Sequence, residues 1–192
     1  MGKLIPDLPI LGEPLIAEFA NTLYIDHKER IDVLDHPAWI AAWLQQAPCA
    51  AALGAPRRFA SAEGERLRLL RDAIRGLLLS KRGEESTVDV AVINDAARAG
   101  HSRRVLERRR RGGVGVVAES VARPFEVFLS AIATSVIDAV EYGDLDLIKV
   151  CSRPECNMFY FRNHHRRRYC NERCANADRQ ARYNRRLHHD AT

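Results

Sequence analysis

The stretch Cys151-Ser152-Arg153-Pro154-Glu155-Cys156, followed after thirteen residues by Cys170-Asn171-Glu172-Arg173-Cys174, decides how the C-terminal part of this sequence folds. Two close cysteine pairs at such a separation can place four thiolates at the corners of a tetrahedron, the geometry that zinc prefers. The chain has five cysteines in all, and its first residues do not predict a secretory signal, so we do not expect a disulfide scaffold. The spacing therefore predicts one structural Zn²⁺, held in a closed shell by Cys151, Cys156, Cys170 and Cys174.

The segments around these cysteines predict a small module that needs its metal to fold. Few apolar residues lie in this part of the chain, whereas a structural zinc contributes on the order of 10 kcal/mol in small modules. We expect a knuckle at the first cysteine pair, then a hairpin of Met158–Phe161 and Arg166–Tyr169, then a helix from Cys174 to about His188. This order is treble-clef-like. His164 or His165 is an alternative fourth ligand, although four sulfurs already complete the shell.

Positive charge is concentrated in the same part of the chain. Residues 151–192 carry ten arginines and four acids, whereas the remaining 150 residues carry twenty basic and twenty-one acidic groups. A nearly neutral body with a strongly basic end indicates a polyanionic partner. Tyr183 and Leu187 of the final helix lie on a different side from its arginines, and we expect them to pack inward. The expected nucleic-acid contacts are Arg166, Arg167, Arg168, Arg173, Arg179, Arg182, Arg185 and Arg186.

Three other interpretations of these arginines stay open. Two or three of them would suffice to offset the −2 charge of a zinc ion with four thiolates, so a purely structural role is one alternative. RNA binding is another, with Tyr160, Tyr169 and Tyr183 as stacking residues if they are exposed. A protein-interaction adaptor is the third. Duplex DNA is the partner that we favour, because eight arginines exceed what the metal requires.

The remainder of the chain predicts a mainly α-helical body with a small β-hairpin. We expect residues 1–145 to form this N-terminal domain and residues 146–192 to form the zinc module. Helices are predicted over 14–23, 35–44, 61 to Lys81-Arg82-Gly83, 87–99 and 124–140, each with an apolar stripe at helical spacing. Residues 103–111 and 114–120 flank Gly112-Gly113 and predict the hairpin. A strand or extended segment over 145–150 leads into the first cysteine.

The composition of the body excludes several classes of function. It has no Gly-rich phosphate loop, nucleophile elbow or His-Glu metal helix, so an enzyme is not expected. No apolar run approaches the length of a membrane span, and we expect a cytoplasmic protein. Arg108-Arg109-Arg110-Arg111 could contact phosphates, or could equally be a charged edge that discourages strand pairing. Regulators commonly dimerise, but no heptad pattern indicates a homodimer here.

The C-terminal pattern resembles the CGNR zinc-finger family, whose members carry an N-terminal ABATE domain. The resemblance rests on the Cys-x4-Cys pair, the aromatic run Phe159-Tyr160-Phe161, the run Arg167-Arg168-Tyr169-Cys170 and the Cys-led basic helix. In the body, Phe19-Ala20-Asn21-Thr22 is similar to the family's Phe-x-Asn-Thr segment, and Leu70-Arg71-Asp72-Ala73-Ile74-Arg75 is similar to its central helix. Together these stretches cover most of the chain.

The resemblance implies a bacterial transcriptional regulator with a DNA-binding finger and an ABATE domain for ligand sensing or assembly. The name-giving motif is altered to Cys174-Ala175-Asn176-Ala177, so Arg173 or Arg179 would have to replace the missing arginine. Arg162 stands where the family often has aspartate. If the domain senses an anionic or other small ligand, the candidate contacts are Asn21, Arg71 and Arg75. Surface or capping hydrogen bonds are the alternative role for these three residues.

Overall fold

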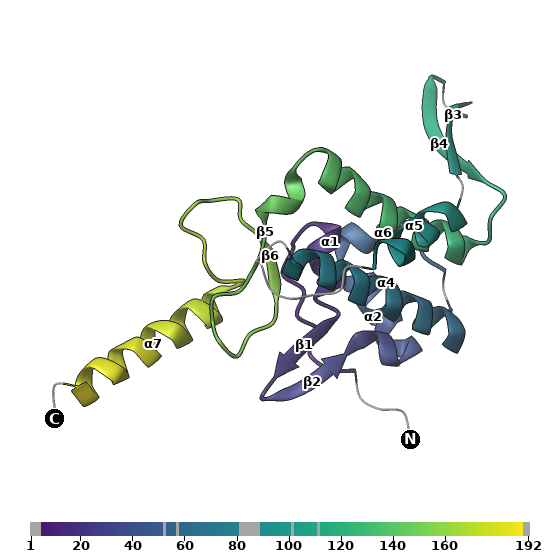
Figure 1. The fold of residues 1–192 in the computed structure, drawn as a ribbon. Coiled ribbons are helices and arrows are strands. Elements are labelled where there is room, and N and C mark those ends of the chain that lie inside the picture. The colour runs from purple at the N-terminus through teal and green to yellow at the C-terminus, as the bar shows by residue number, and fades with distance from the viewer. Residues whose placement is uncertain are drawn as a thin grey trace.

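A bundle of helices forms the body of the protein, and the metal-binding segment lies at one end of it (Figure 1). The computed structural model describes residues 5–51, 53–56, 58–80, 89–100, 102–110 and 112–189. Helix α4 contacts α1, α5 and α6, and α6 also contacts α1 and α5. The helices of the body are α1 (Leu15–Ala20), α2 (Pro37–Gln46), α3 (Pro48–Ala51), α4 (Ser61–Ser80), α5 (Val90–Ala99) and α6 (Pro124–Glu141).

The starts of these helices follow from local sequence. Pro37 and Pro124 occupy the first turns of α2 and α6, where their fixed φ suits a helix and the missing N–H costs nothing. Asp89 caps α5, because its side chain accepts a hydrogen bond from the Val92 N–H. At the other end of α5, a Cβ on Gly100 would lie 2.2 Å from the Glu126 carbonyl oxygen. Only glycine therefore allows the end of α5 to approach α6 so closely.

Within the described residues, three separate two-stranded antiparallel sheets accompany the helices. The predicted hairpin is confirmed as β3 (Ser102–Arg108) paired with β4 (Val114–Ser120). The extended segment before the first cysteine is a 3₁₀ turn, Asp144–Leu147, followed by β5 (Ile148–Val150), which pairs with β6 (Phe159–Phe161). The third sheet, β1 (Leu23–Asp26) with β2 (Glu29–Asp32), was not predicted.

The first predicted helix is too long. Helix α1 ends at Ala20, and Leu23, which has helical spacing from Phe19, belongs to β1 instead. The turn between β1 and β2 contains His27 and Lys28, both at positive φ, a conformation that sequence patterns associate with glycine or asparagine. The predicted end of α4 at 81–83 and the predicted start of α5 at Thr87 lie outside the described residues.

One continuous core joins the body to the metal-binding segment. Phe19, Trp43 and Phe128 are buried in the body, and Phe159 and Tyr160 of β6 belong to the same cluster of buried residues. None of the described helices is long and apolar enough to cross a membrane.

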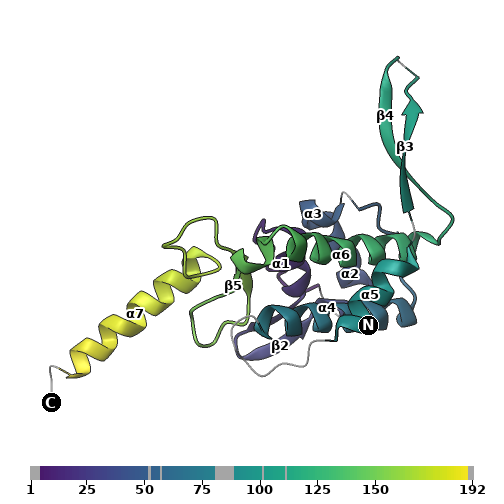
Figure 2. The ribbon, with the colours of Figure 1, turned by 45° about the horizontal axis from the view of Figure 1, so that its top comes forward.

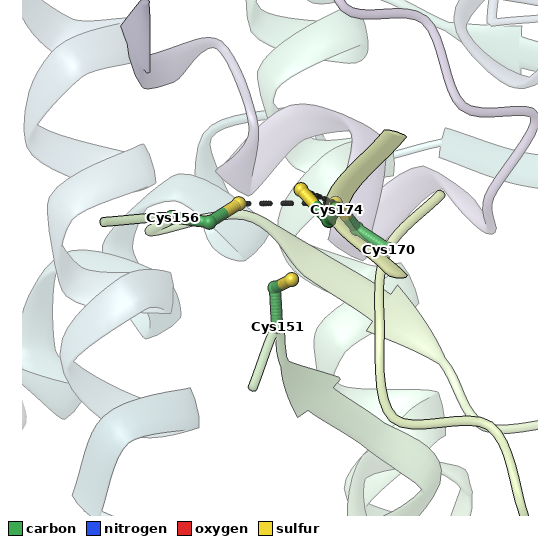
Figure 3. Close-up of side chains that lie close together, drawn as sticks. All are labelled: Cys151, Cys156, Cys170 and Cys174. Carbon is green, nitrogen blue, oxygen red and sulfur yellow. Dashed lines mark hydrogen bonds between the residues drawn. The ribbon is translucent and has the colours of Figure 1, made fainter. Parts of the chain in front are cut away.

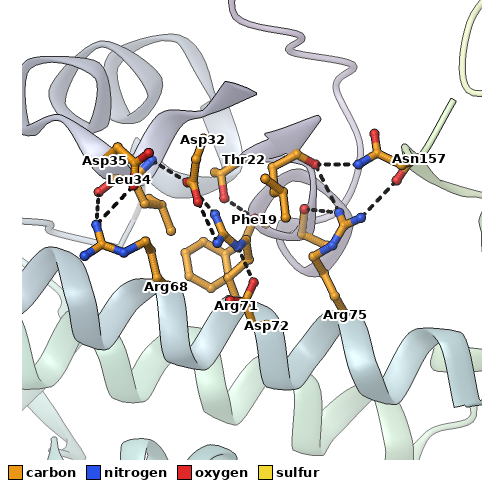
Figure 4. A network of polar contacts seen from close by, with 12 residues as sticks. Phe19, Thr22, Asp32, Leu34, Asp35, Arg68, Arg71, Asp72, Arg75 and Asn157 are labelled. Carbon is orange, nitrogen blue, oxygen red and sulfur yellow. Dashed lines mark hydrogen bonds and ion pairs between the residues drawn. The ribbon is translucent and has the colours of Figure 1, made fainter. Parts of the chain in front are cut away.

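A buried ion pair fixes α4 against β2. Arg71 is fully buried, and its two terminal nitrogens donate to the two carboxylate oxygens of Asp32 at 2.5 and 2.8 Å (Figure 4). Asp32 also accepts a hydrogen bond from the Leu34 N–H, which caps the following 3₁₀ turn. The Arg71 Nε donates to Asp72 at 2.9 Å. All the polar groups of this pair are thus satisfied inside the protein, as a buried charge requires.

Removing one partner of this pair tests its contribution to stability. We expect Arg71→Ala to lower the free energy of unfolding by about 3–5 kcal/mol, because Asp32 would remain buried without its counter-charge. Arg68→Ala removes a partly exposed arginine of the same helix that pairs with Asp35 at 3.4 Å and donates to the Leu34 carbonyl at 2.9 Å, and should cost about 1–2 kcal/mol. Urea unfolding of both variants gives the comparison; equal losses would contradict the assignment.

Candidate metal centre and nucleic-acid interface

Four thiols converge at one end of the body. The Sγ atoms of Cys151, Cys156, Cys170 and Cys174 all lie within 4.8 Å of one another (Figure 3). The Cys156–Cys170 and Cys170–Cys174 sulfur distances are 3.8 and 3.6 Å. Zinc–sulfur bonds of about 2.3 Å in a tetrahedron require sulfurs about 3.8 Å apart. The donor set and its spacing therefore fit one structural Zn²⁺ without rearrangement of the backbone.

Hydrogen bonds of the backbone N–H groups position three of the four ligands. The Cys151 N–H donates to the Met158 carbonyl at 2.8 Å, which extends the β5–β6 ladder to the first ligand. The Cys156 N–H donates to the Arg153 carbonyl at 3.0 Å and closes the knuckle turn. Cys174 is the third residue of α7 (Glu172–His189), and its N–H is capped by the Asn171 side chain. Cys174 thus lies at the positive end of the helix dipole, which favours a thiolate.

The thiols are electrostatically suited to a cation. Hydrogen bonds from Cys156 and Cys170 lower the pKa of Cys151 to about 2. The hydrogen bond with Cys151, together with burial, raises the pKa of Cys156 to about 12. Hydrogen bonds with Cys151 and Cys156, together with burial, raise the pKa of Cys170. One negative sulfur therefore makes further ionisation unfavourable in this confined space. A divalent cation that bonds directly to all four sulfurs removes this obstacle.

The prediction that Arg166–Tyr169 forms the second strand of the finger hairpin is wrong. Strand β6 pairs with β5, whereas Arg166–Tyr169 forms no strand. The Tyr160 hydroxyl instead donates to the Arg167 carbonyl at 2.9 Å, which holds the returning loop against β6 by a side chain. The imidazoles of His164 and His165 are exposed and stack on each other, and they are not part of the thiol cluster.

Side chains on either side of α1, Glu13 before it and Asn21 after it, hold β6 to the body. The Asn21 side chain accepts from the Phe159 N–H at 2.7 Å and donates to the Phe159 carbonyl at 2.9 Å. Glu13 accepts from the Phe161 N–H at 2.8 Å through one oxygen and from Arg167 at 2.5 Å through the other. Both Asn21 and Glu13 are buried. The metal-binding segment is therefore joined to the body through its own backbone and not only through side-chain packing.

Arg75 makes a second connection between the body and the metal-binding segment. Its guanidinium donates to the carbonyls of Ala20 and Leu23 and, at 3.3 Å, to that of Asn157 (Figure 4). It also lies over the Phe159 ring, 4.9 Å from the centroid. Burial, and then the nearby charge of Arg71, lower the pKa of Arg75 to about 10. The guanidinium is thus still charged near neutral pH and donates to three backbone carbonyls.

The three candidate ligand contacts of the body are engaged by the protein itself. Asn21, Arg71 and Arg75 all make the internal hydrogen bonds described above. These are contacts between distant parts of the chain, with Asn21 and Arg71 buried, and not the surface or capping hydrogen bonds raised from the sequence. Arg71 also lines an open depression of about 380 Å³ beside Asp32 and Asp72. Four carboxylates line this depression against three guanidiniums, so an anion would meet net negative charge there. The structure offers no support for Asn21, Arg71 and Arg75 as an anion site.

The eight candidate arginines fall into two groups. Arg167 is half-buried and is held by Glu13, by the carbonyls of Phe161 and Cys170, and by the Tyr160 ring. It is a structural residue of the finger. The remaining seven are exposed in the loop before α7 and along that helix: Arg166, Arg168, Arg173, Arg179, Arg182, Arg185 and Arg186.

Helix α7 projects from the body, and both views show it leading away from the helical bundle (Figures 1 and 2). Among the described elements, α7 packs extensively against no other helix or strand. Tyr183 and Leu187 were expected to pack inward, but they are 58% and 51% exposed, because the helix extends beyond the core. The whole circumference of its second half is therefore open to a partner.

Sequence reasoning missed two residues that position the finger. Neither Glu13 nor Asn157 was among the predicted site residues. The Asn157 side chain accepts from the Ile25 N–H at 3.1 Å, and its carbonyl accepts from Arg75. These contacts span more than 80 residues along the chain, and no local pattern signals them. The structural role of Glu13 becomes evident only once its distant partner Arg167 is known.

The fold and the four-thiol site define a helical protein with a C-terminal zinc finger. Residues 13–143 match the ABATE family, described as "Putative stress-induced transcription regulator", and residues 148–187 match the CGNR zinc finger. The chain therefore belongs to the ABATE family and carries a CGNR zinc finger, as its sequence motifs indicated. No curated protein matches this chain.

Removal of zinc is expected to unfold the finger. Chelation, or Cys170→Ser, should release one zinc per chain and lower the helical signal of α7, because an isolated 18-residue helix is marginally stable in water. Cys49→Ser, which changes the one cysteine outside the cluster, is the matched control and should retain the metal. Metal analysis combined with circular dichroism gives the result. Stoichiometric zinc in Cys170→Ser would contradict the four-sulfur shell.

The Asn21 contact makes a separate prediction. Asn21→Ala should lower the free energy of unfolding by about 2 kcal/mol, because the N–H and carbonyl of Phe159 would both lose their buried partner. Zinc content should stay at one per chain, since Asn21 does not touch the thiols. Asn184→Ala on the exposed half of α7 is the control, and denaturant unfolding is the measurement. A variant as stable as the wild type would show that β6 does not depend on Asn21.

Proposed function

We propose that this protein is a zinc-dependent regulator that binds duplex DNA through α7 and the loop before it. The observation that carries the proposal is the exposed, arginine-rich helix that starts at the metal centre. At 1.5 Å per residue its 18 residues span about 27 Å. The major groove of DNA admits an α-helix, and arginines along that helix suit phosphates and guanine edges.

Within α7 the arginines differ in how freely they can reach a partner. Arg182 pairs with Asp178 at 3.0 Å, and the Arg179 guanidinium donates to the Asn176 side chain. Among the described residues, Arg185 and Arg186 have no acidic partner within salt-bridge distance and are exposed. These two are therefore the best candidates for direct phosphate contacts. Asn176 belongs to the altered family motif, and its hydrogen bond with Arg179 places that arginine beside the motif.

The tyrosines support duplex DNA over single-stranded RNA as the partner. Tyr160 is buried, and Tyr169 is half-buried with its hydroxyl donating to Asp178 at 2.6 Å. Of the three candidate stacking residues, Tyr183 alone is exposed. Recognition of single strands relies on several aromatic platforms along a groove. A single tyrosine beside a row of arginines suits a duplex better.

The helical body would then act as the sensing or assembly part of the regulator. Its contacts with β6 through Glu13, Asn21 and Arg75 offer a route by which a change in α1 or α4 would reach the finger. The family description of residues 13–143 as a transcription regulator agrees with this division of roles.

A salt titration tests the role of α7. Arg185→Ala and Arg186→Ala should each weaken duplex binding and reduce the slope of log affinity against log salt by about 0.9, because each loses one phosphate contact. Arg98→Ala on α5 removes the same charge from an exposed position and should leave the slope unchanged. Fluorescence anisotropy on a labelled duplex, with single-stranded RNA as competitor, gives both the slope and the preference. Equal slopes in all variants would rule out α7 as the contact, and preferential displacement by RNA would favour the RNA alternative.

A further inference from the structure

The β3–β4 hairpin has no role in the function proposed above. We call its described residues, 102–110 and 112–120, the basic ribbon. Its two strands of seven residues each project from the body at the end away from α7 (Figures 1 and 2). Among the described elements, the strands pack extensively only on each other. An isolated two-stranded hairpin is marginally stable in water, so the ribbon is an element that gains by contact with a partner.

One face of the basic ribbon is apolar and uncovered. The pairing places Leu106 opposite Val116 and Arg108 opposite Val114. Because side chains of paired residues point to the same face, these four share one side of the ribbon. Leu106 is 76% exposed, and Val114 and Val116 are each 61% exposed. Arg104, two residues before Leu106, belongs to the same face, so the aliphatic side chains are bracketed by arginines.

The charge of the basic ribbon selects the kind of partner. Its described residues include five arginines and two acids, Glu107 and Glu119. Arg103 pairs across the strands with Glu119 at 3.0 Å. The other four, which lie on β3 and at the tip, have no acidic partner within salt-bridge distance among the described residues: Arg104, Arg108, Arg109 and Arg110. A second copy of the same ribbon would be repelled, whereas a dense polyanion would be attracted.

The tip of the basic ribbon is shaped for close approach. Gly112 and Gly113 both have positive φ, and the Gly112 N–H closes the turn on the Arg109 carbonyl at 3.0 Å. The Arg109 side chain crosses Gly115, where a Cβ would lie 2.6 Å from its Nε. Three consecutive described arginines are thus gathered at a narrow end. A two-stranded ribbon of this width fits the major groove of DNA, where aliphatic side chains can contact thymine methyl groups.

We propose that the basic ribbon is a second duplex-binding element, so that one molecule bridges two duplex segments. This inference rests on DNA binding by α7 as proposed above. The two basic elements extend from opposite ends of one body (Figures 1 and 2). Because the finger and the body share one core, α7 and the basic ribbon are carried on a single framework.

The test is a bridging assay with the zinc-loaded full chain. A biotinylated duplex on beads is loaded with protein and then offered a second, fluorescent duplex. The ribbon variant carries Arg108→Ala, Arg109→Ala and Arg110→Ala, all at exposed positions. The matched control removes the same charge from exposed body positions through Arg30→Ala, Arg58→Ala and Arg98→Ala. Light scattering without DNA measures the molar mass of each protein.

We expect the wild type and the control to capture the second duplex and the ribbon variant to capture at least tenfold less. Binding of the ribbon variant to the first duplex should persist, weakened no more than about tenfold. Bridging by the ribbon variant, or equal loss in the control, would overturn the inference. A ribbon variant with lower molar mass would also overturn it, because the ribbon would then bind a second copy.

Two further outcomes separate this inference from the proposed function. Wild-type protein that binds one duplex but captures no second one overturns the bridging inference and leaves DNA binding by α7 intact. Wild-type protein that binds no duplex at all removes both.

Discussion

The hydrogen bonds between Asn21 and the backbone of Phe159 are the constraint on which the arrangement of this protein depends. Both polar groups of a buried strand residue are satisfied by one side chain from 138 positions earlier in the chain. Glu13 adds a contact to the next N–H on the same edge of β6. Since buried backbone groups without partners are costly, this match admits only one register of β6 against α1. The cysteines that follow β5 and precede β6 are placed by the same register.

The metal centre completes this arrangement at the other side of β6. Cys151 continues from β5, and Cys174 begins α7, so the zinc joins the core of the protein to a helix that lies outside it. Burial of Phe159 and Tyr160 supplies hydrophobic stabilisation to a segment that is otherwise rich in arginine. The half-buried Arg167 binds Glu13 and donates to the Cys170 carbonyl. Arg167 of the finger thus serves the fold, whereas the arginines of α7 are exposed to solvent.

Much of this structure could be predicted from the sequence because its signals are local. The cysteine spacing gave the four ligands, since a tetrahedral metal restricts which loop lengths can close around it. Pro37 and Pro124 marked helix starts, and Gly112-Gly113 marked the turn of the ribbon, because each restricts or frees φ at one position. The family resemblance rested on motifs in both parts of the chain and is confirmed by the family matches.

What could not be predicted depends on contacts between distant residues. The turn at His27-Lys28 lacks the usual glycine, and the surrounding structure holds its positive φ values. The partner of β6 was misassigned because Arg166–Tyr169 is closer in sequence than β5. Tyr183 and Leu187 carry an inward-facing pattern, yet the helix continues past the core that they would have joined. In each case contacts between distant parts of the chain, which no local pattern reports, decided the outcome.

The shared core also bears on how such a protein can be rearranged by recombination. A finger that is attached to the rest of its chain only by a linker can be exchanged between unrelated chains without loss of stability. Here, separation of the chain between the 3₁₀ turn and β5 would remove the core contacts of Phe159. It would also leave the buried Asn21 amide without its hydrogen-bond partner. A transplanted finger would need a host helix with the same acid and amide at the same spacing. The two halves of this chain are therefore expected to be inherited as a pair, with substitutions along their common edge compensated on the opposite side.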